Sequence, residues 1–123
     1  MIIGIGCDII EVDRVRHAVE REAFKTRVFT AAEIAYCEGR GQQQFASFAA
    51  RFAAKEAVLK ALGTGLRGGA LTEIEVTNDA LGKPCVSLSG YHGEMAERLG
   101  VKQVHLSLSH SKANATAYVI LEG

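Results

Sequence analysis

The alternation of apolar and polar residues changes period several times along this 123-residue chain, and each change marks an expected element. Residues 2–7 form a continuous apolar run that ends at Asp8, and such a run is typical of a short strand buried on both faces. We therefore expect Asp8 at the carboxyl end of that strand. Asp13 is placed to cap a helix that ends near Arg21 or Glu22.

A capping box opens the next expected helix. Thr30 and Glu33 have the spacing at which a hydroxyl and a carboxylate each satisfy a free backbone N–H, and this helix should end near residues 39–41. The longest expected helix covers about residues 44–62. It is apolar nearly all round, so it should be central and buried, and Gly63 is a natural C-terminal stop.

In the second half of the chain the apolar period becomes two. From Glu73 onwards apolar and polar residues alternate on either side of a turn cluster at residues 78–82, which predicts a hairpin. Residues 90–99 read as an amphipathic helix, and residues 104–121 contain two further strands. The expected order is strand, three helices, two strands, helix, two strands. This order predicts an α+β fold, with a mostly antiparallel sheet packed on the long helix.

Composition narrows the class of protein. The length favours a single domain over residues 1–123. Fourteen basic residues balance fourteen acidic ones, so global charge argues against non-specific nucleic-acid binding. No apolar run reaches the length of a membrane span, and the N-terminus lacks a signal-peptide pattern, so we expect a cytoplasmic protein. The widely spaced Cys7, Cys37 and Cys85 predict buried reduced thiols, with neither a disulfide framework nor a zinc site.

One charged residue stands out on the long helix. At about 100° per residue, Glu56 shares a side with Phe52 and Leu59, and Lys60 follows one turn later. A charge taken out of water costs several kcal/mol unless it is paired or binds a metal. Two interpretations stay open: an i, i+4 ion pair worth about 0.2–0.5 kcal/mol, or a functional site.

Asp8 makes the second interpretation more attractive. Taken alone it reads as a turn or capping residue, but two hard oxygen ligands such as Asp8 and Glu56 suit Mg²⁺ when substrate phosphates complete its shell. Lys60 would supply a compact positive charge for a phosphate. These residues predict a carboxylate, metal and phosphate site.

Two loops carry further candidates. Residues 63–69, Gly-Thr-Gly-Leu-Arg-Gly-Gly, either connect elements or present backbone N–H groups to a ligand; they lack the Walker pattern. His110 ends a strand beside serine and lysine, which suits a phosphate-contacting rim better than a hydrolase triad, since no G-x-S-x-G elbow occurs. His17, His92 and His105 have no ligand-like spacing and are expected at the surface.

Five short sequence motifs follow one another along the chain. They are GIGCDIIEVDR at residues 4–14, Phe29 with Glu33, RFAAKEAVLKALGTG at residues 51–65, GKPCVSL at residues 82–88, and SLSHSKANATAYVI at residues 107–120. Together they resemble the holo-(acyl carrier protein) synthase family of phosphopantetheinyl transferases, in its short bacterial form, over essentially the whole chain.

The resemblance implies a reaction and roles in it. Enzymes of this family transfer 4′-phosphopantetheine from coenzyme A to a serine of apo acyl carrier protein, with Mg²⁺, in fatty acid or polyketide biosynthesis. It implies that Asp8 and Glu56 are metal ligands and that Lys60 contacts the pyrophosphate. These three are the expected catalytic residues, with Glu56 the first choice and Asp8 the second choice of base.

The resemblance also implies a coenzyme cleft and an oligomer. Arg51 and His110 match positions near the nucleotide phosphates, and Gly63, Gly65 and Pro84 would line the cleft. The family is typically trimeric, with each active site shared between subunits.

The acidic carrier protein would be gripped by basic residues of the first helix, of which Arg14 and Arg21 are the candidates here, although acidic residues are interleaved with them. Two rival functions stay open. One is a metal-dependent nucleotide pyrophosphatase that uses the same acidic pair. The other is a non-catalytic coenzyme A-binding module. The basic first helix favours the transferase, because neither rival needs a surface for an acidic protein.

Overall fold

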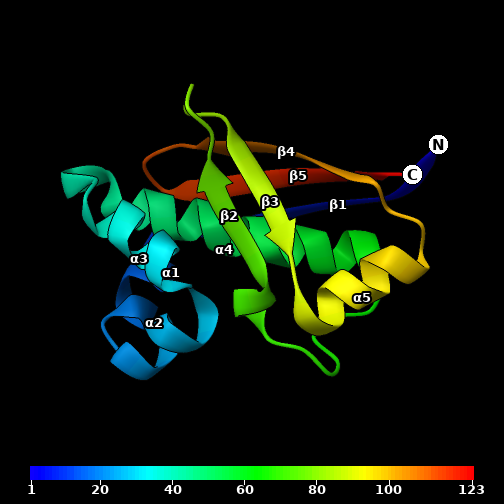
Figure 1. Ribbon diagram of the computed structural model, residues 1–123. Coiled ribbons are helices and arrows are strands. Elements are labelled where there is room, and N and C mark those ends of the chain that lie inside the picture. The colour runs from blue at the N-terminus through cyan, green and yellow to red at the C-terminus, as the bar shows by residue number, and fades with distance from the viewer.

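The computed structural model describes residues 1–123 and has an α+β architecture (Figure 1). The predicted fold class is thereby confirmed. The elements in chain order are β1 Ile2–Glu11, α1 Val12–Val19, α2 Glu22–Val28, α3 Ala31–Glu38, α4 Gln44–Leu62, β2 Ile74–Asn78, β3 Pro84–Leu88, α5 Gly90–Arg98, β4 Gln103–His110 and β5 Asn114–Glu122, with 3₁₀ turns at Gly41–Gln43 and Leu71–Glu73.

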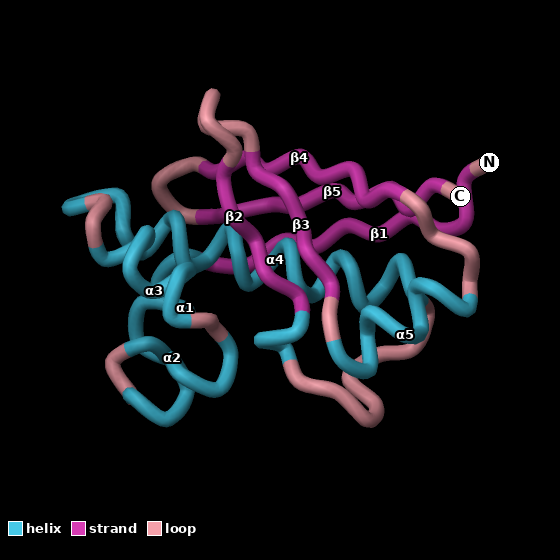
Figure 2. The backbone as a smooth tube through the Cα atoms, viewed as in Figure 1, coloured by secondary structure: helices cyan, strands magenta, loops and turns pink.

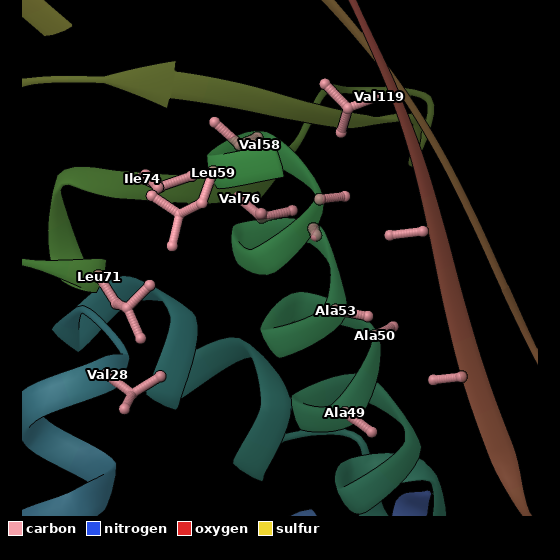
Figure 3. Close-up of a cluster of buried hydrophobic side chains, with 14 of the residues drawn as sticks. Val28, Ala49, Ala50, Ala53, Val58, Leu59, Leu71, Ile74, Val76 and Val119 are labelled. Atoms are coloured by element: carbon pink, nitrogen blue, oxygen red, sulfur yellow. The ribbon is translucent and has the colours of Figure 1, made fainter. Parts of the chain in front are cut away.

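Helix α4 is the centre of the molecule. The antiparallel sheet β1-β5-β4 packs on one side of it, and the β2-β3 hairpin crosses its other side (Figures 1 and 2). Small alanines such as Ala49 and Ala53 let β5 approach closely, while larger residues such as Val58 and Leu59 extend toward the hairpin (Figure 3). The prediction of a buried central helix is confirmed, because most residues of α4 are buried.

Two glycines set the distance between β1 and α4. A Cβ atom on Gly6 would lie 2.0 Å from the backbone oxygen of Ala57, and one on Gly4 would lie 2.2 Å from that of Ala61. Any side chain at either position would therefore push the strand off the helix. Because alternate residues of a strand share a face, Asp8 continues this line of close contacts along α4.

Two expectations about the first strand are wrong. Strand β1 runs to Glu11, so Asp8 lies within the strand and not at its end. Only one face is covered, and only partly: Ile5 and Ile9 lie on the other face and are 69% and 63% exposed. A continuous apolar run cannot show whether the same chain covers both faces of a strand.

The sequence pattern placed three helices before the hairpin, and the structure has four. The additional helix is α2, which has 7 residues and buries only Val28 fully. A helix of two turns offers too few positions for an apolar period to show. The capping box was predicted correctly, since Thr30 and Glu33 exchange both bonds.

Burial corrects three further expectations. Cys37 is buried, which raises the pKa of its thiol to about 12, but Cys7 and Cys85 are exposed. All three thiols are free. His92, expected at the surface, is completely buried, whereas His17 and His105 are exposed. None of the helices combines the length and the apolar character that a membrane crossing needs.

Candidate active site

Lys60 joins the two elements that carry the carboxylates. Its Nζ donates to Asp8 Oδ1 at 3.1 Å and to the backbone oxygen of Cys7 at 2.9 Å, so it ties α4 to β1. The Asp8 side chain is 17% exposed and that of Lys60 is 57% exposed. The i, i+4 alternative is not realised, since Lys60 pairs with Asp8 and no ion pair joins it to Glu56.

Glu56 lies close enough to Asp8 for their charges to interact. Burial, followed by the negative charge of Asp8, raises the pKa of the Glu56 carboxyl above its usual range, while the charge of Lys60 opposes the shift. The hydrogen bond to Asp8 raises the pKa of Lys60, which therefore stays charged. Only Asp8 is paired with the Lys60 ammonium group, so the two carboxylates carry excess negative charge when both are ionised.

A pocket of about 400 Å³ opens beside this group. It is lined by Glu56, Leu59, Lys60, Gly63, Gly65 and Leu66. Gly63 ends α4 with φ 78°, and Gly65 follows with φ 62°, so the left-handed backbone that only glycine adopts easily turns the loop back over the end of the helix. Leu66 was not singled out from the sequence, because a leucine inside a glycine-rich loop gives no periodic signal.

Arg51 and Pro84 lie away from the carboxylates. Arg51 is 4% exposed, and its guanidinium group lies 4.2 Å from the centre of the Tyr36 ring and donates from Nη2 to Asn78 Oδ1 at 2.6 Å. Pro84 pairs with Asn78 at the start of β3. Both residues therefore belong to the contact between α4 and the hairpin, and this chain does not bring them to the pocket of Glu56.

His110 lies in a separate pocket, away from both Glu56 and Arg51. It lines a pocket of about 440 Å³ together with Arg16 and Lys112, at the turn between β4 and β5. Lys112 belongs to the phosphate-contacting rim expected beside His110, whereas Arg16 was not singled out as a phosphate contact, because no spacing pattern joins residues so far apart in the chain. The pocket collects three basic side chains and no carboxylate, so it suits an anionic group.

The basic candidates Arg14 and Arg21 do line one groove. They flank a pocket of about 500 Å³ whose floor includes Ile10, Phe24 and Phe52. Phe52 lies one turn before Glu56 on α4, and Ile10 lies on the same strand as Asp8. The groove therefore leads along α4 toward the carboxylates.

The residues of this site could supply only part of the ligand shell of a magnesium ion. No group of three or more His, Cys, Asp and Glu side chains that could hold a metal occurs in the chain. Asp8 and Glu56 offer hard oxygens, and the influence of Asp8 on the pKa of Glu56 shows that their charges are close. Mg²⁺ is commonly bound by one or two carboxylates, with water and substrate phosphates as its remaining ligands, so the donor set is compatible with it.

The fold and this site define a class of transferase. Residues 4–119 match the model of the 4′-phosphopantetheinyl transferase superfamily. The holo-(acyl-carrier-protein) synthase of Clostridium tetani is 51% identical over 124 residues, which cover 100% of this chain and 98% of the relative. The chain belongs to the 4′-phosphopantetheinyl transferase superfamily and, within it, to the holo-(acyl-carrier-protein) synthases. The predicted resemblance is thereby confirmed.

Solved structures agree with this placement. The crystal structure of holo-(acyl-carrier-protein) synthase from Neisseria meningitidis matches with a TM-score of 0.89 and 36% identity, covering 100% of both chains. That of the Bacillus anthracis enzyme matches with a TM-score of 0.81 and 41% identity, covering 98% of this chain and 96% of that one, and it is in complex with CoA (3′,5′-ADP).

Proposed function

We propose that this chain transfers 4′-phosphopantetheine from coenzyme A to a serine of apo acyl carrier protein, in fatty acid biosynthesis, with residues 1–123 acting as one catalytic domain. The observation that carries the proposal is the group of Asp8, Glu56 and Lys60, in which a half-buried carboxyl of raised pKa lies beside a charged ammonium group. Its relatives of the same family are named for this product. The location in the cytoplasm stays a prediction.

Different residues of the chain accept the proton and stabilise the negative charge in this reaction. The serine hydroxyl attacks the phosphorus that carries pantetheine, and the bond to the adenosine 3′,5′-bisphosphate part breaks. Glu56 accepts the serine proton, a role that suits a carboxyl whose pKa is raised above its usual range by burial and by the charge of Asp8. Lys60 stabilises the negative charge that grows on the departing phosphate oxygens. Asp8 fixes the Lys60 ammonium group and is the second choice of base.

Magnesium is part of this proposal. Asp8 and Glu56 would hold the ion, and when bound it would act as a Lewis acid toward the phosphate oxygens. The excess negative charge of the carboxylate pair supports this assignment.

The groove of Arg14 and Arg21 would receive the carrier protein. An acidic helical partner would find cationic side chains at the rim and the apolar Ile10, Phe24 and Phe52 below. Since the groove leads along α4 to Glu56, a partner bound there would present its serine at the reacting centre.

A homotrimer would complete the site. The outer face of the sheet exposes large apolar side chains on neighbouring strands, since Ile5 pairs with Ile120 and Cys7 pairs with Tyr118. Such a face on a soluble protein marks an interaction surface. A neighbouring subunit there would bring its His110 pocket or its hairpin to the carboxylates, which one chain does not do.

Assembly gives a testable prediction. Ile5→Lys should convert the trimer to monomers and lower the transfer rate, because a charge on this face would have to be desolvated at the interface. Light scattering coupled to size exclusion measures the mass. Leu99→Lys, at a 42% exposed leucine just after α5, is the matched control and should stay trimeric. A wild-type protein that is monomeric at assay concentration would contradict the trimer.

A single reaction tests the proposed function. We expect an apo carrier protein incubated with this enzyme, coenzyme A and Mg²⁺ to gain the mass of one phosphopantetheine group, and adenosine 3′,5′-bisphosphate to appear in equal amount. Release of the nucleotide without a mass gain would support a pyrophosphatase instead. Coenzyme A binding without turnover, across several carriers, would indicate a binding module.

A further inference from the structure

The glycine loop, residues 63–69, is held in place without hydrogen bonds to the rest of the chain. It connects α4 to the 3₁₀ turn Leu71–Glu73 and passes beside α5 (Figure 1). No backbone hydrogen bond joins residues 64–69 to any other part of the chain, and residues 65–68 are exposed. The position of the loop therefore depends on the side chains against which its backbone packs.

The end of the loop packs on two neighbouring side chains of α5. A Cβ atom on Gly68, whose φ is 76°, would lie 3.0 Å from Tyr91 Cε2, so the loop contacts the tyrosine ring. A Cβ atom on Gly69 would lie 2.6 Å from His92 Nε2 and 2.7 Å from Glu73 Oε1. Gly69 therefore lies directly against both atoms and covers the histidine ring.

His92 is completely buried, and neither of its ring nitrogens has a hydrogen-bond partner. Glu73 Oε1 lies 3.9 Å from Nε2, beyond hydrogen-bond distance, and accepts from the His92 backbone N–H at 3.2 Å instead. The Tyr91 ring packs edge-on against the imidazole, with the centroids 5.4 Å apart. A buried polar group without a partner is costly, and a buried charge without a partner is far more costly.

Few charges surround the His92 ring. Of the elements packed most closely against α5, the 3₁₀ turn carries Glu73, and β3 carries only the thiol of Cys85. The titratable groups on α5 itself and on the loop are Tyr91, Glu94, Glu97, Arg98 and Arg67. Burial lowers the pKa of the imidazole below its usual 6.5, and the negative charge of Glu73 opposes the shift. The ring is therefore neutral near pH 7 while the loop covers it.

We propose that His92 makes the position of the glycine loop depend on pH: the neutral ring keeps Gly68 and Gly69 packed on α5, and a protonated ring releases them. Protonation beneath the closed loop places a charge where neither water nor a hydrogen-bond acceptor reaches it. Movement of Gly69 away from the ring exposes Nε2 to water and leaves room for Glu73 to approach it. The released loop is thus the form in which the charged ring is satisfied.

The direction of the pH effect follows from the lowered pKa of His92. Between that lowered value and 6.5, the released form binds one proton and the closed form binds none. The closed loop therefore has its full stability above about pH 6.5 and loses it as the pH falls through this range.

The release is a property of the fold and does not rest on the proposed function. Gly63, Gly65 and Leu66 of the same loop also line the pocket of Glu56 and Lys60, so release at low pH would loosen one wall of the candidate active site. An enzyme that is inactive at every pH would overturn the proposed function and would leave the release of the loop to be measured separately.

Trypsin cleavage after the exposed Arg67 measures the release, because a protease cuts the opened form of a loop. The rate is divided by that of a free peptide of residues 61–73, which cancels the pH dependence of trypsin itself. We expect this ratio to rise up to about tenfold between pH 7.5 and 5.5, as the uptake of one proton requires. Cleavage after Arg51, which is 4% exposed, should not rise with it. An equal rise at both sites would overturn the proposal, because the whole domain would then be unfolding.

Variants assign the effect to the ring. His92→Phe and His92→Gln cannot be protonated, so the ratio should be independent of pH in both, and the pair keeps the test valid if one does not fold. Glu73→Gln removes the charge that favours the protonated ring, so release should move to lower pH. His17→Gln, at an exposed histidine of α1, is the control and should keep the wild-type pH dependence. A constant ratio in the wild type, or a rise that persists in both His92 variants, would overturn the proposal.

Discussion

Replacing Glu56 by glutamine is expected to lower the transfer rate by about 10²–10⁴-fold and at the same time to make the protein more stable at neutral pH. The loss of rate follows if the Glu56 carboxylate accepts the serine proton, because the amide has no basic oxygen to replace it. The gain in stability follows because burial and the charge of Asp8 both disfavour the ionised carboxylate. A neutral side chain of the same shape removes that cost.

The sign of the pH dependence follows from the raised pKa. Above the usual carboxyl value of 4.5 the unfolded chain releases its proton, while folded Glu56 still holds one. The folded state then binds more protons, so the wild-type protein loses stability as the pH rises from that value through the raised pKa. The glutamine variant lacks this loss. Its advantage should be absent at low pH, grow through the window and remain constant above it.

Thermal midpoints measured at several pH values, beside the mass assay of the carrier, test both expectations together. Glu94→Gln, at an exposed position of α5, is the matched control and should change neither quantity. A Glu56→Gln protein with unchanged turnover would remove Glu56 from the reaction. A variant less stable than the wild type at pH 8 would show that the ionised carboxylate is favoured by its surroundings.

Replacing Lys55 by methionine is expected to cost about 3–5 kcal/mol of unfolding free energy, a large part of the about 5–15 kcal/mol typical of a folded domain. The Lys55 ammonium lies 2.9 Å from Glu33 Oε1, and both side chains are completely buried. Lys55 also donates to the backbone oxygens of Leu71 and Ile74, so it ties α4 to the segment after the glycine loop. Without Lys55, the buried Glu33 carboxylate loses its only cationic partner and two backbone carbonyls lose a donor.

Urea unfolding measures this cost. Lys25→Met is the control, because Lys25 forms an ion pair of similar length with Glu38, at 2.7 Å, where Glu38 is 47% exposed. An ion pair near the surface contributes less than about 1 kcal/mol, so the control should lose little. Equal losses in the two variants would mean that burial does not set the value of the Lys55 contact. A Lys55→Met protein as stable as the wild type would show that Glu33 is satisfied by its other donors alone.

The sequence predicted the site through three residues. Charged side chains interrupted apolar patterns at Asp8, Glu56 and Lys60. In the structure Lys60 contacts Asp8, and both of their charges act on Glu56. Their roles as catalytic residues and metal ligands stay predictions.

Other parts of the site had no signal in the sequence. A pocket of about 490 Å³ joins the loop after α4 to Tyr91 of α5, and the pocket that contains His110 also includes Arg16 of α1. Both are contacts between segments that are distant in the chain. Arg51, expected near phosphates, donates to Asn78 within the chain, a contact that the sequence did not indicate.

By itself the sequence determined most of the elements, though not α2 or the end of β1, because apolar periods, a capping box and the glycine after a helix act between neighbouring residues. It also determined the close approach of β1 to α4, since Gly4 and Gly6 leave no room for a side chain. Only the tertiary structure decided that Lys60 pairs with Asp8 and not with Glu56. It also decided that Lys55 and His92 are buried and that Ile5 and Ile9 are exposed to solvent. Burial and pairing depend on which distant segments cover a residue, and no local pattern contains that information.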